Sequence, residues 1–143
     1  MSDVKNILLV GVGGQGIILA SKILAQGLIA AGYDVKMSEV HGMAQRGGSV
    51  TTQVRYGSEV HSPIIGKGQA DIIVAFEKME CLRWIEYLKK EGKAVVNDYE
   101  IPSAPILAGK ATYPEKILDV LKEKIDITVI KAADIAKNEL GNL

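Results

Sequence analysis

Several features that mark common classes of protein are missing from this sequence. It has a single cysteine, Cys81, so an internal disulfide cannot form, and the chain cannot supply the thiolates of an iron-sulfur cluster or an all-cysteine zinc site. One thiol is typical of a reducing compartment, and we therefore expect a cytoplasmic protein. Apolar runs end well before the ~18 residues of a membrane span, and the N-terminus lacks a secretory leader, so we expect no membrane attachment.

Charge of one sign and aromatic residues are also scarce. Seventeen Lys and Arg residues balance seventeen Asp and Glu residues, and the 143-residue chain has one Trp, one Phe and five Tyr. Proteins that bind nucleic acid usually combine a basic surface with exposed aromatic rings, so we exclude that class. The two histidines, His41 and His61, are not spaced with Cys81 as metal ligands are, and we expect no metal site.

The length of the chain and the order of its apolar segments predict the fold. We assign residues 1–143 to one domain. The predicted strands are residues 5–10, 35–39, 49–56, 71–76, 93–97 and 126–130, and the predicted helices are residues 15–31, 78–90, 114–124 and 132–140. Gly92 is expected to end the second helix, and Pro114 to begin the third. This alternation predicts a three-layer α/β/α, Rossmann-like fold with a mixed, mostly parallel sheet.

Two local arrangements within this sheet follow from the connections. Residues 5–39 contain a strand, a turn, a helix and a second strand, which predicts a crossover between parallel strands. The Gly57-Ser58 pair separates the alternating residues 49–56 from residues 59–61. We expect these last two segments to form an antiparallel hairpin.

A glycine-rich turn joins the first strand to the first helix. Its sequence, GVGGQG, has the G-x-G-x-x-G spacing of dinucleotide-binding turns. In that motif Gly11 permits a tight turn, Gly13 lets the backbone approach a phosphate, and Gly16 lets the helix pack closely on the strand. Because the free N–H groups of a helix N-terminus favour an anion, we take the turn as a candidate binding site, comprising Gly11, Gly13, Gly14, Gln15 and Gly16. The alternative is that the glycines only allow a close crossover and bind nothing.

Glu39 extends the comparison with dinucleotide-binding domains. It lies at the end of the second predicted strand, 23 residues after Gly16. In those domains an acidic residue near this place hydrogen-bonds the ribose. A free-standing NAD-binding domain that uses Glu39 is therefore one hypothesis for the function.

A second glycine-rich segment, HGMAQRGGSV, follows the second predicted strand. The carboxyl ends of strands border the ligand crevice in an open α/β sheet, so we expect this loop to line a site. The guanidinium of Arg46 can hold a phosphate or carboxylate while the neighbouring glycines expose backbone N–H groups. The candidate residues here are His41, Arg46, Gly47, Gly48 and Ser49. The alternatives are a surface ion pair for Arg46 and a backbone hydrogen bond for His41.

The remaining polar and reactive residues are given structural roles. Glu77 and Glu80 bracket the start of the second predicted helix, and acids there usually offset the helix dipole; the alternative is a role in a site. Cys81, on the same helix, is expected to be a small core or boundary residue. His61 is expected to face solvent.

Four blocks of sequence, in order along the chain, carry a resemblance to a known family. They are GVGGQGI at residues 11–17, SEVHGMAQRGGSV at 38–50, SPII at 62–65 and ADIIVAFEKMECLR at 70–83. Together they resemble the gamma subunit, or gamma domain, of the 2-oxoacid:ferredoxin oxidoreductases. The resemblance is strongest to the small beta subunit of the indolepyruvate-specific enzymes.

The resemblance implies a subunit of an enzyme that oxidatively decarboxylates a 2-oxoacid to an acyl-CoA. Thiamine diphosphate and iron-sulfur clusters would lie on a larger partner subunit, and electrons would pass through the complex to ferredoxin. This chain would hold no cofactor alone and would be inactive in isolation. Residues 11–16 and 41–49 would become candidate contacts for a CoA phosphate or for the large subunit.

Two further points qualify this comparison. Family members usually continue for several elements past a Gly-Asn step that resembles Gly141-Asn142, so we expect a truncated or shortened relative. A third functional hypothesis, suggested by the double glycine of the first turn, is an ATP-dependent activating enzyme of the ubiquitin-like type. We rank it last, because that chemistry typically needs a longer chain and a zinc-binding cysteine set.

Overall fold

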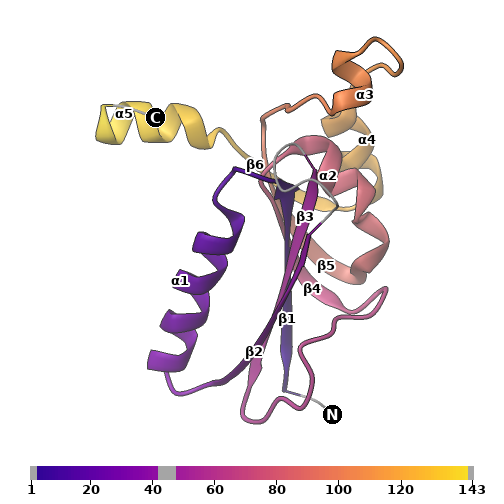
Figure 1. Ribbon diagram of the computed structural model, residues 1–143. Helices are drawn as coiled ribbons and strands as arrows, with labels where there is room; N and C mark the ends of the chain where they lie inside the picture. Colours follow the sequence, from indigo (N-terminus) through magenta and orange to yellow (C-terminus); the bar gives the residue numbers. More distant parts are fainter. Residues whose placement is uncertain (1–2, 42–47, 142–143) are drawn as a thin grey trace.

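The chain forms a six-stranded sheet with helices on both faces. The computed structural model describes residues 3–41 and 48–141 (Figure 1). The strands are β1 (Lys5–Val12), β2 (Asp34–His41), β3 (Ser49–Gly57), β4 (Ala70–Ala75), β5 (Leu88–Asn97) and β6 (Asp126–Ile130), in the order β2-β3-β1-β4-β5-β6. The helices are α1 (Ile17–Ala30), α2 (Lys78–Arg83), α3 (Ala104–Leu107), α4 (Ile117–Lys124) and α5 (Ala132–Leu140), with a short 3-10 turn, η1 (Ile85–Tyr87).

The sheet is mixed, as the sequence predicts. Three of the five strand pairings are parallel, joining β1 to β4, β4 to β5 and β5 to β6. The other two are antiparallel, and both involve β3, which pairs with β1 on one side and β2 on the other. The prediction of a mixed, mostly parallel α/β sheet with an antiparallel element is confirmed.

The position of β3 corrects two expectations. First, β1 and β2 run in the same direction but are not neighbours, because β3 lies between them. Second, the hairpin partner of β3 is β2, and residues 59–61 form no strand. After Gly57 the chain crosses the face of the sheet, where Val60 N donates to Asp34 Oδ2 at 2.8 Å and Ile65 N donates to Gln53 Oε1 at 2.6 Å. Because Val60 and Ile65 are buried, this segment covers the sheet and does not extend it.

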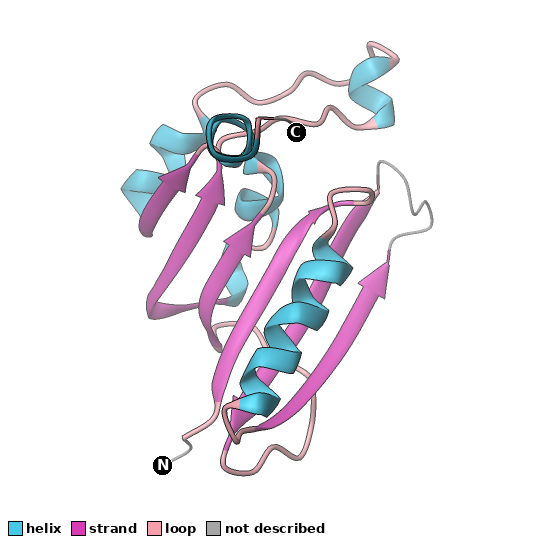
Figure 2. Ribbon diagram, turned by 90° about the vertical axis from the view of Figure 1, so that its left-hand side faces the viewer, coloured by secondary structure: helices cyan, strands magenta, loops and turns pink. Residues whose placement is uncertain are grey.

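The helices form a layer on each face of the sheet. Helix α1 packs on β1, β2 and β3, while α2 and α4 lie on the opposite face (Figures 1 and 2). Helix α5 lies on the same side as α1, near the carboxyl ends of β5 and β6 (Figure 2). This is the predicted three-layer arrangement. In the part of the chain that the structure describes, no helix has the length and apolar character needed to cross a membrane.

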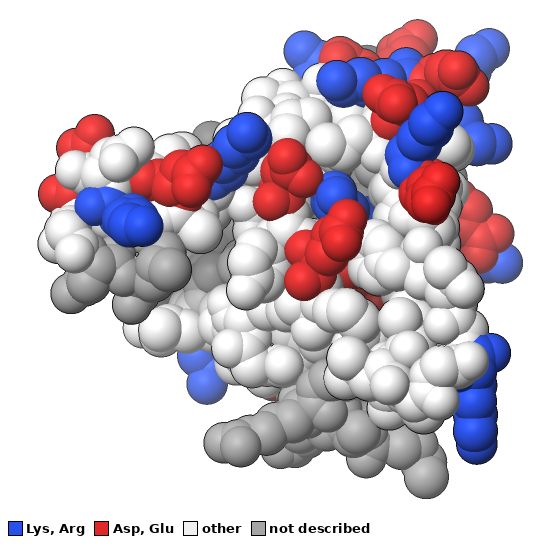
Figure 3. Space-filling model, turned by 90° about the horizontal axis from the view of Figure 1, so that it is seen from above, with Lys and Arg blue, Asp and Glu red and all other residues white. Residues whose placement is uncertain are grey.

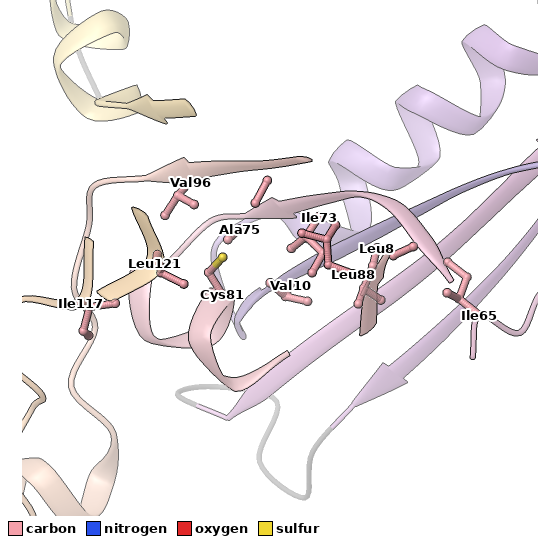
Figure 4. Packing of buried hydrophobic residues seen from close by; sticks show 12 residues of the cluster. Leu8, Val10, Ile65, Ile73, Ala75, Cys81, Leu88, Val96, Ile117 and Leu121 are labelled. Carbon is pink, nitrogen blue, oxygen red and sulfur yellow. The ribbon is translucent and has the colours of Figure 1, made fainter. Parts of the chain in front are cut away.

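Two apolar cores account for the unbroken aliphatic run of β1. Leu8 and Val10 face α2 and α4, whereas Ile7 and Leu9 face α1. The cluster under α2 and α4 is the larger one (Figure 4) and comprises Leu8, Val10, Ile65, Ala70, Ile73, Ala75, Cys81, Leu88, Ala94, Val96, Ile117 and Leu121. Each fully buried Leu or Ile contributes about 1.5–3 kcal/mol. A strand covered on both faces has no solvent side, so its sequence shows no alternation.

The second predicted helix is shorter than expected. Helix α2 ends at Arg83, and β5 begins at Leu88, where residues 78–90 were expected to be helical. The apolar spacing persists past the end of α2 because Ile85 still packs on the core and Leu88 enters it from a strand. Gly92 does not end a helix; it lies inside β5, where a Cβ would come within 2.6 Å of Leu88 Cδ1.

The third predicted helix also begins later than expected. Helix α4 starts at Ile117, after Lys116, which adopts a left-handed backbone with φ of 57°. Pro114 lies in the preceding connection, where the Tyr113 hydroxyl donates a hydrogen bond to Glu77, the N-cap residue of α2. The expected connection at residues 99–109 contains the short helix α3. The predicted strand at 126–130 and the predicted helix at 132–140 are confirmed.

Candidate functional site at the glycine turn

The glycines of the first turn are needed for two different reasons, the backbone conformation of the turn and the close packing of α1 on β1. Gly14 and Gly16 have φ of 98° and 83°, in the left-handed region that side chains disfavour. Gly11 lies in β1, where a Cβ would meet Ile17 Cδ1 at 2.5 Å and Phe76 Cβ at 3.0 Å. The roles therefore differ from those expected: Gly11 permits close packing of the helix, and Gly16 permits the turn.

The turn leaves the N-terminus of α1 open. Gly16 is the N-cap residue and provides no side-chain cap, so the first amides of α1 have no intrahelical acceptor. Beside them lies a shallow cavity of about 260 Å³, lined by Val12, Gly13, Gly14, Gly16, Ile17, Ile18 and Val50. This described lining offers backbone N–H groups and apolar side chains, and no charged ones. Any counter-charge for an anion must therefore come from elsewhere.

Gln15 is part of a chain of amide hydrogen bonds along the carboxyl edge of the sheet. Its Oε1 accepts from Val12 N at 2.9 Å, and its Nε2 donates to Phe76 O at 3.0 Å. Asn97 Nδ2 donates to the same carbonyl at 3.1 Å, and Asn97 Oδ1 accepts from Ala132 N at 3.0 Å. The side chain of Gln15 thus fixes the turn against β4, and Asn97 continues the connection to β5 and α5.

Two of the candidate residues in the second glycine-rich segment lie beside the turn. Gly13 N donates to Gly48 O at 2.9 Å, and Ser49 begins β3 directly opposite Val12. The backbone of His41 ends β2 and pairs with Val50, which in turn pairs with Gly11. The strand order therefore brings the two candidate segments together at one edge of the sheet.

Some of the predicted site lies outside the described residues. These are Arg46 and Gly47, together with the side chain of His41. Their expected roles toward an anion stay predictions.

Glu39 is separated from the glycine turn by a strand. It pairs with Thr52 of β3, and Thr52 pairs with Leu9 of β1, so Glu39 lies two strand spacings, about 10 Å, from β1. In a dinucleotide-binding domain the second strand lies beside the first, which brings the acidic residue near the ribose. The geometry therefore does not favour the NAD-binding hypothesis.

Two carboxylates are buried next to the turn, and for both the sequence favours a helix-dipole role over a role in a site. Glu77 caps α2 and has no exposed surface; it accepts from Glu80 N at 3.0 Å, Tyr113 Oη at 2.8 Å and Ile101 N at 3.2 Å. Glu80 is 3% exposed and accepts from Ser49 Oγ at 2.7 Å. The E-x-x-E spacing could have indicated the cap. The distant partners leave no signal in the sequence.

The protonation states around this pair follow from burial. Burial, and next the hydrogen bond to Glu77, raise the pKa of Tyr113, so its hydroxyl remains a donor. Burial raises the pKa of Cys81 to about 12, and its sulfur lies inside the apolar cluster (Figure 4). Cys81 is therefore a core residue, as predicted, and not a reactive thiolate. His61 is exposed, also as predicted, and its Nε2 lies 3.6 Å from Glu59 Oε1.

A second, polar cavity of about 530 Å³ lies between α2 and the start of α4. Burial opposes the charge on Lys78 there, but hydrogen bonds to Glu100 and Asp98, at 2.7 and 3.3 Å, raise its pKa. Seen from above, the molecule presents positive and negative side chains next to one another (Figure 3). Among residues 3–41 and 48–141 no group of His, Cys, Asp and Glu is arranged to hold a metal.

Comparison with known proteins supports the resemblance seen in the sequence. The family model described as pyruvate ferredoxin/flavodoxin oxidoreductase matches residues 6–143. The chain is 45% identical over 123 residues to the indolepyruvate oxidoreductase subunit IorB of Pyrococcus horikoshii, covering 85% of this chain and 61% of that protein. It is 46% identical over 121 residues to the protein of the same name in Thermococcus kodakarensis, covering 85% and 59%. The chain thus spans about three fifths of the length of these relatives.

Solved structures show the same fold. The gamma subunit of a keto/oxoacid ferredoxin oxidoreductase from Geobacter sulfurreducens superposes with a TM-score of 0.64 at 25% identity, covering 96% of this chain and 68% of that one. The pyruvate oxidoreductase subunit PORC of Thermotoga maritima gives a TM-score of 0.68 at 22% identity, covering 99% and 69%. The agreement of family model, relatives and fold shows that this chain belongs to the pyruvate ferredoxin/flavodoxin oxidoreductase family.

Proposed function

We propose that this chain is the small subunit of a 2-oxoacid:ferredoxin oxidoreductase that acts on indolepyruvate or a similar arylpyruvate. The observation that carries the proposal is the 41–46% identity to four proteins named as an indolepyruvate oxidoreductase subunit. The complete enzyme would oxidatively decarboxylate the 2-oxoacid to an acyl-CoA and pass the electrons to ferredoxin.

The residues of this chain support a division of labour within such an enzyme. The chain has one cysteine, which is buried in the core, so it cannot supply the ligands of an iron-sulfur cluster. We assign the clusters and thiamine diphosphate to a larger partner subunit in the cytoplasm. This chain would then complete the assembly and contribute part of the surface that CoA contacts.

The glycine turn is the part of this chain best suited to CoA. The open amides of α1 can hold a phosphate oxygen, and the apolar wall formed by Ile17, Ile18 and Val50 can contact the uncharged part of the ligand. Arg46 is our candidate for the counter-charge that the described lining lacks. A charge-assisted hydrogen bond from Arg46 contributes about 1.5–3 kcal/mol, so Arg46→Ala should weaken CoA affinity or assembly by that amount.

The test is to produce the tagged chain together with its large subunit and assay the purified complex. We expect arylpyruvate- and CoA-dependent reduction of ferredoxin by the complex and none by either subunit alone. Copurification from the native cells should recover the same partner. Turnover by the isolated chain, or micromolar NADH binding that Glu39→Ala abolishes, would overturn the proposal.

A further inference from the structure

We propose that Glu80 is a positioning residue for the glycine turn, acting through Ser49 on the start of β3. Only the identity of the ligand at the turn rests on the proposed function. The positioning itself is carried by hydrogen bonds between described residues, and it can be tested without any ligand.

The first step is the attachment of Ser49 to α2. Glu80 is 3% exposed, and its Oε2 accepts from Ser49 Oγ at 2.7 Å and from Trp84 Nε1 at 3.3 Å. Its Oε1 accepts from Arg83 Nε at 3.2 Å. Arg83 and Trp84 are on the same turn of chain as Glu80, whereas Ser49 is 31 residues away. The Ser49 hydrogen bond is therefore the one that connects this carboxylate to the sheet.

The second step leads from Ser49 to both sides of the cavity. The preceding residue, Gly48, accepts from Gly13 N at 2.9 Å, and the following residue, Val50, is part of the cavity wall. Side chains alternate along a strand, so Ser49 points toward α2 while Val50 points toward α1. Fixing Ser49 thus fixes one hydrogen-bond acceptor for the turn and one wall of the cavity.

The third step is the rigidity of the base to which Glu80 is attached. A helix of six residues such as α2 has little stability of its own. Glu77 holds it in place: fully buried, it caps α2 and accepts from Ile101 N and Tyr113 Oη. Buried carboxylates with several donors hold one geometry, because any movement would leave a desolvated charge unpaired.

The test of positioning is amide hydrogen exchange at Gly13, measured by NMR on the full 143-residue chain. Glu80→Ala should speed exchange at Gly13 about tenfold and leave the amides of β4 and β5 unchanged. Ser49→Ala should have the same effect, and the double variant should add nothing further. Glu80→Gln retains an acceptor oxygen for Ser49 and should restore most of the protection.

The matched control is Glu86→Ala. Glu86 is a glutamate on η1 with a 57% exposed side chain, 3.2 Å from Lys67 Nζ on the surface. This variant should leave exchange at Gly13 unchanged. If Glu80→Ala does not fold, exchange at Gly13 in Ser49→Ala and Glu80→Gln tests the positioning role instead. The fluorescence of Trp84, the single tryptophan, then reports whether the hydrogen bonds around Ser49 have changed.

The ligand is tested separately in the assembled complex, with CoA as the probe. Ser49→Ala should raise the KM for CoA about tenfold and leave kcat nearly unchanged. Unchanged exchange at Gly13 would overturn the positioning role. Faster exchange with an unchanged KM would overturn CoA as the ligand of the positioned turn. If exchange rises as expected but the wild-type complex neither assembles nor uses CoA, the proposed function fails and the positioning of the turn by Glu80 is supported.

Discussion

Single residues at the glycine turn differ in what they contribute, and two of them do not have the role that the motif predicts. Gly11 is needed for the close approach of β1 to Ile17, whereas Gly14 and Gly16 are needed for their backbone conformation. The sequence identified the turn correctly but assigned its packing role to the wrong glycine. The reason is that the motif describes a spacing, and the contact made by each position depends on where the helix begins.

A substitution separates these roles. In Gly11→Ala the new methyl group would meet Ile17, Gln15 and Phe76 at 2.5–3.0 Å, so we expect a loss of about 1–3 kcal/mol in the free energy of unfolding. Gly14→Ala has open space around the new Cβ and should lose about 1–2 kcal/mol through backbone strain alone. Urea unfolding followed by circular dichroism measures both. A neutral Gly11→Ala would show that α1 can shift away from β1.

A third glycine should behave in the opposite way. Gly27 lies inside α1, and a Cβ there would meet nothing within 4 Å. Alanine stabilises a helix interior relative to glycine, so Gly27→Ala should raise the free energy of unfolding by about 0.5–1 kcal/mol. The same urea experiment measures it. A decrease would indicate that another molecule covers α1 in solution, for instance through self-association.

The hydrogen bond from Tyr113 to the buried carboxylate of Glu77 makes the free energy of unfolding depend on pH in the alkaline range. Tyr113→Phe removes one of the hydrogen bonds to Glu77 and should cost about 1.5 kcal/mol at pH 7. Because the pKa of Tyr113 is raised above 10.0 in the folded chain, its contribution is complete below pH 10 and is lost as pH rises beyond that value. The difference between wild type and variant, measured in urea at several pH values, should therefore shrink above pH 10. A difference that grows there would contradict this linkage.

At the scale of whole elements, the sequence predicted those helices and strands whose conformation depends on their own residues. The strands β1, β4 and β6 and the helices α1 and α5 follow from local apolar spacing and were predicted within a few residues. The predictions were wrong where the conformation or the position of an element depends on a segment far away in the sequence. Residues 88–90 continue a helical apolar pattern but belong to β5, where Leu88 pairs with Ala70. The sequence near β3 does not show that this strand inserts between β1 and β2.

The candidate site shows the same limit. The two glycine-rich segments could be placed at one edge from their positions after predicted strands. The buried pair Glu77 and Glu80 could not be recognised as a connection, because its partners Ser49, Ile101 and Tyr113 come from remote parts of the chain.

Helix α5 is expected to be less protected from exchange than α4. In the part of the chain described, none of its residues is buried, and its first amide is held by Asn97 Oδ1 at 3.0 Å. Local opening requires little free energy where few apolar contacts are broken. Its amides should exchange at least about tenfold faster than those of α4, which buries Ile117 and Leu121. Exchange followed by mass spectrometry tests this, and equal protection of the two helices would contradict it.

At the scale of the whole molecule, balanced charge limits how a partner is found. The formal net charge is zero, and the face seen in Figure 3 mixes both signs. Long-range steering needs a field of one sign, so the association rate with the proposed large subunit should change by less than about threefold between low and high salt. Stopped-flow mixing of the two subunits measures this rate. A fall of tenfold or more would reveal a concentrated charge on the binding surface.

The insertion of β3 between β1 and β2 also bears on the order of folding. The closest β2–β3 pair joins His41 to Val50, nine positions apart, whereas β1 meets β3 across as many as 51 positions, from Lys5 to Tyr56. Hairpins between strands close in sequence form in microseconds, whereas pairing between strands far apart in sequence is slower because a longer loop must be closed. We therefore expect β2 and β3 to form a two-stranded ribbon first, and β1 to pair with β3 afterwards. The glycine turn that follows β1 would then reach its final conformation only after β3 is in place.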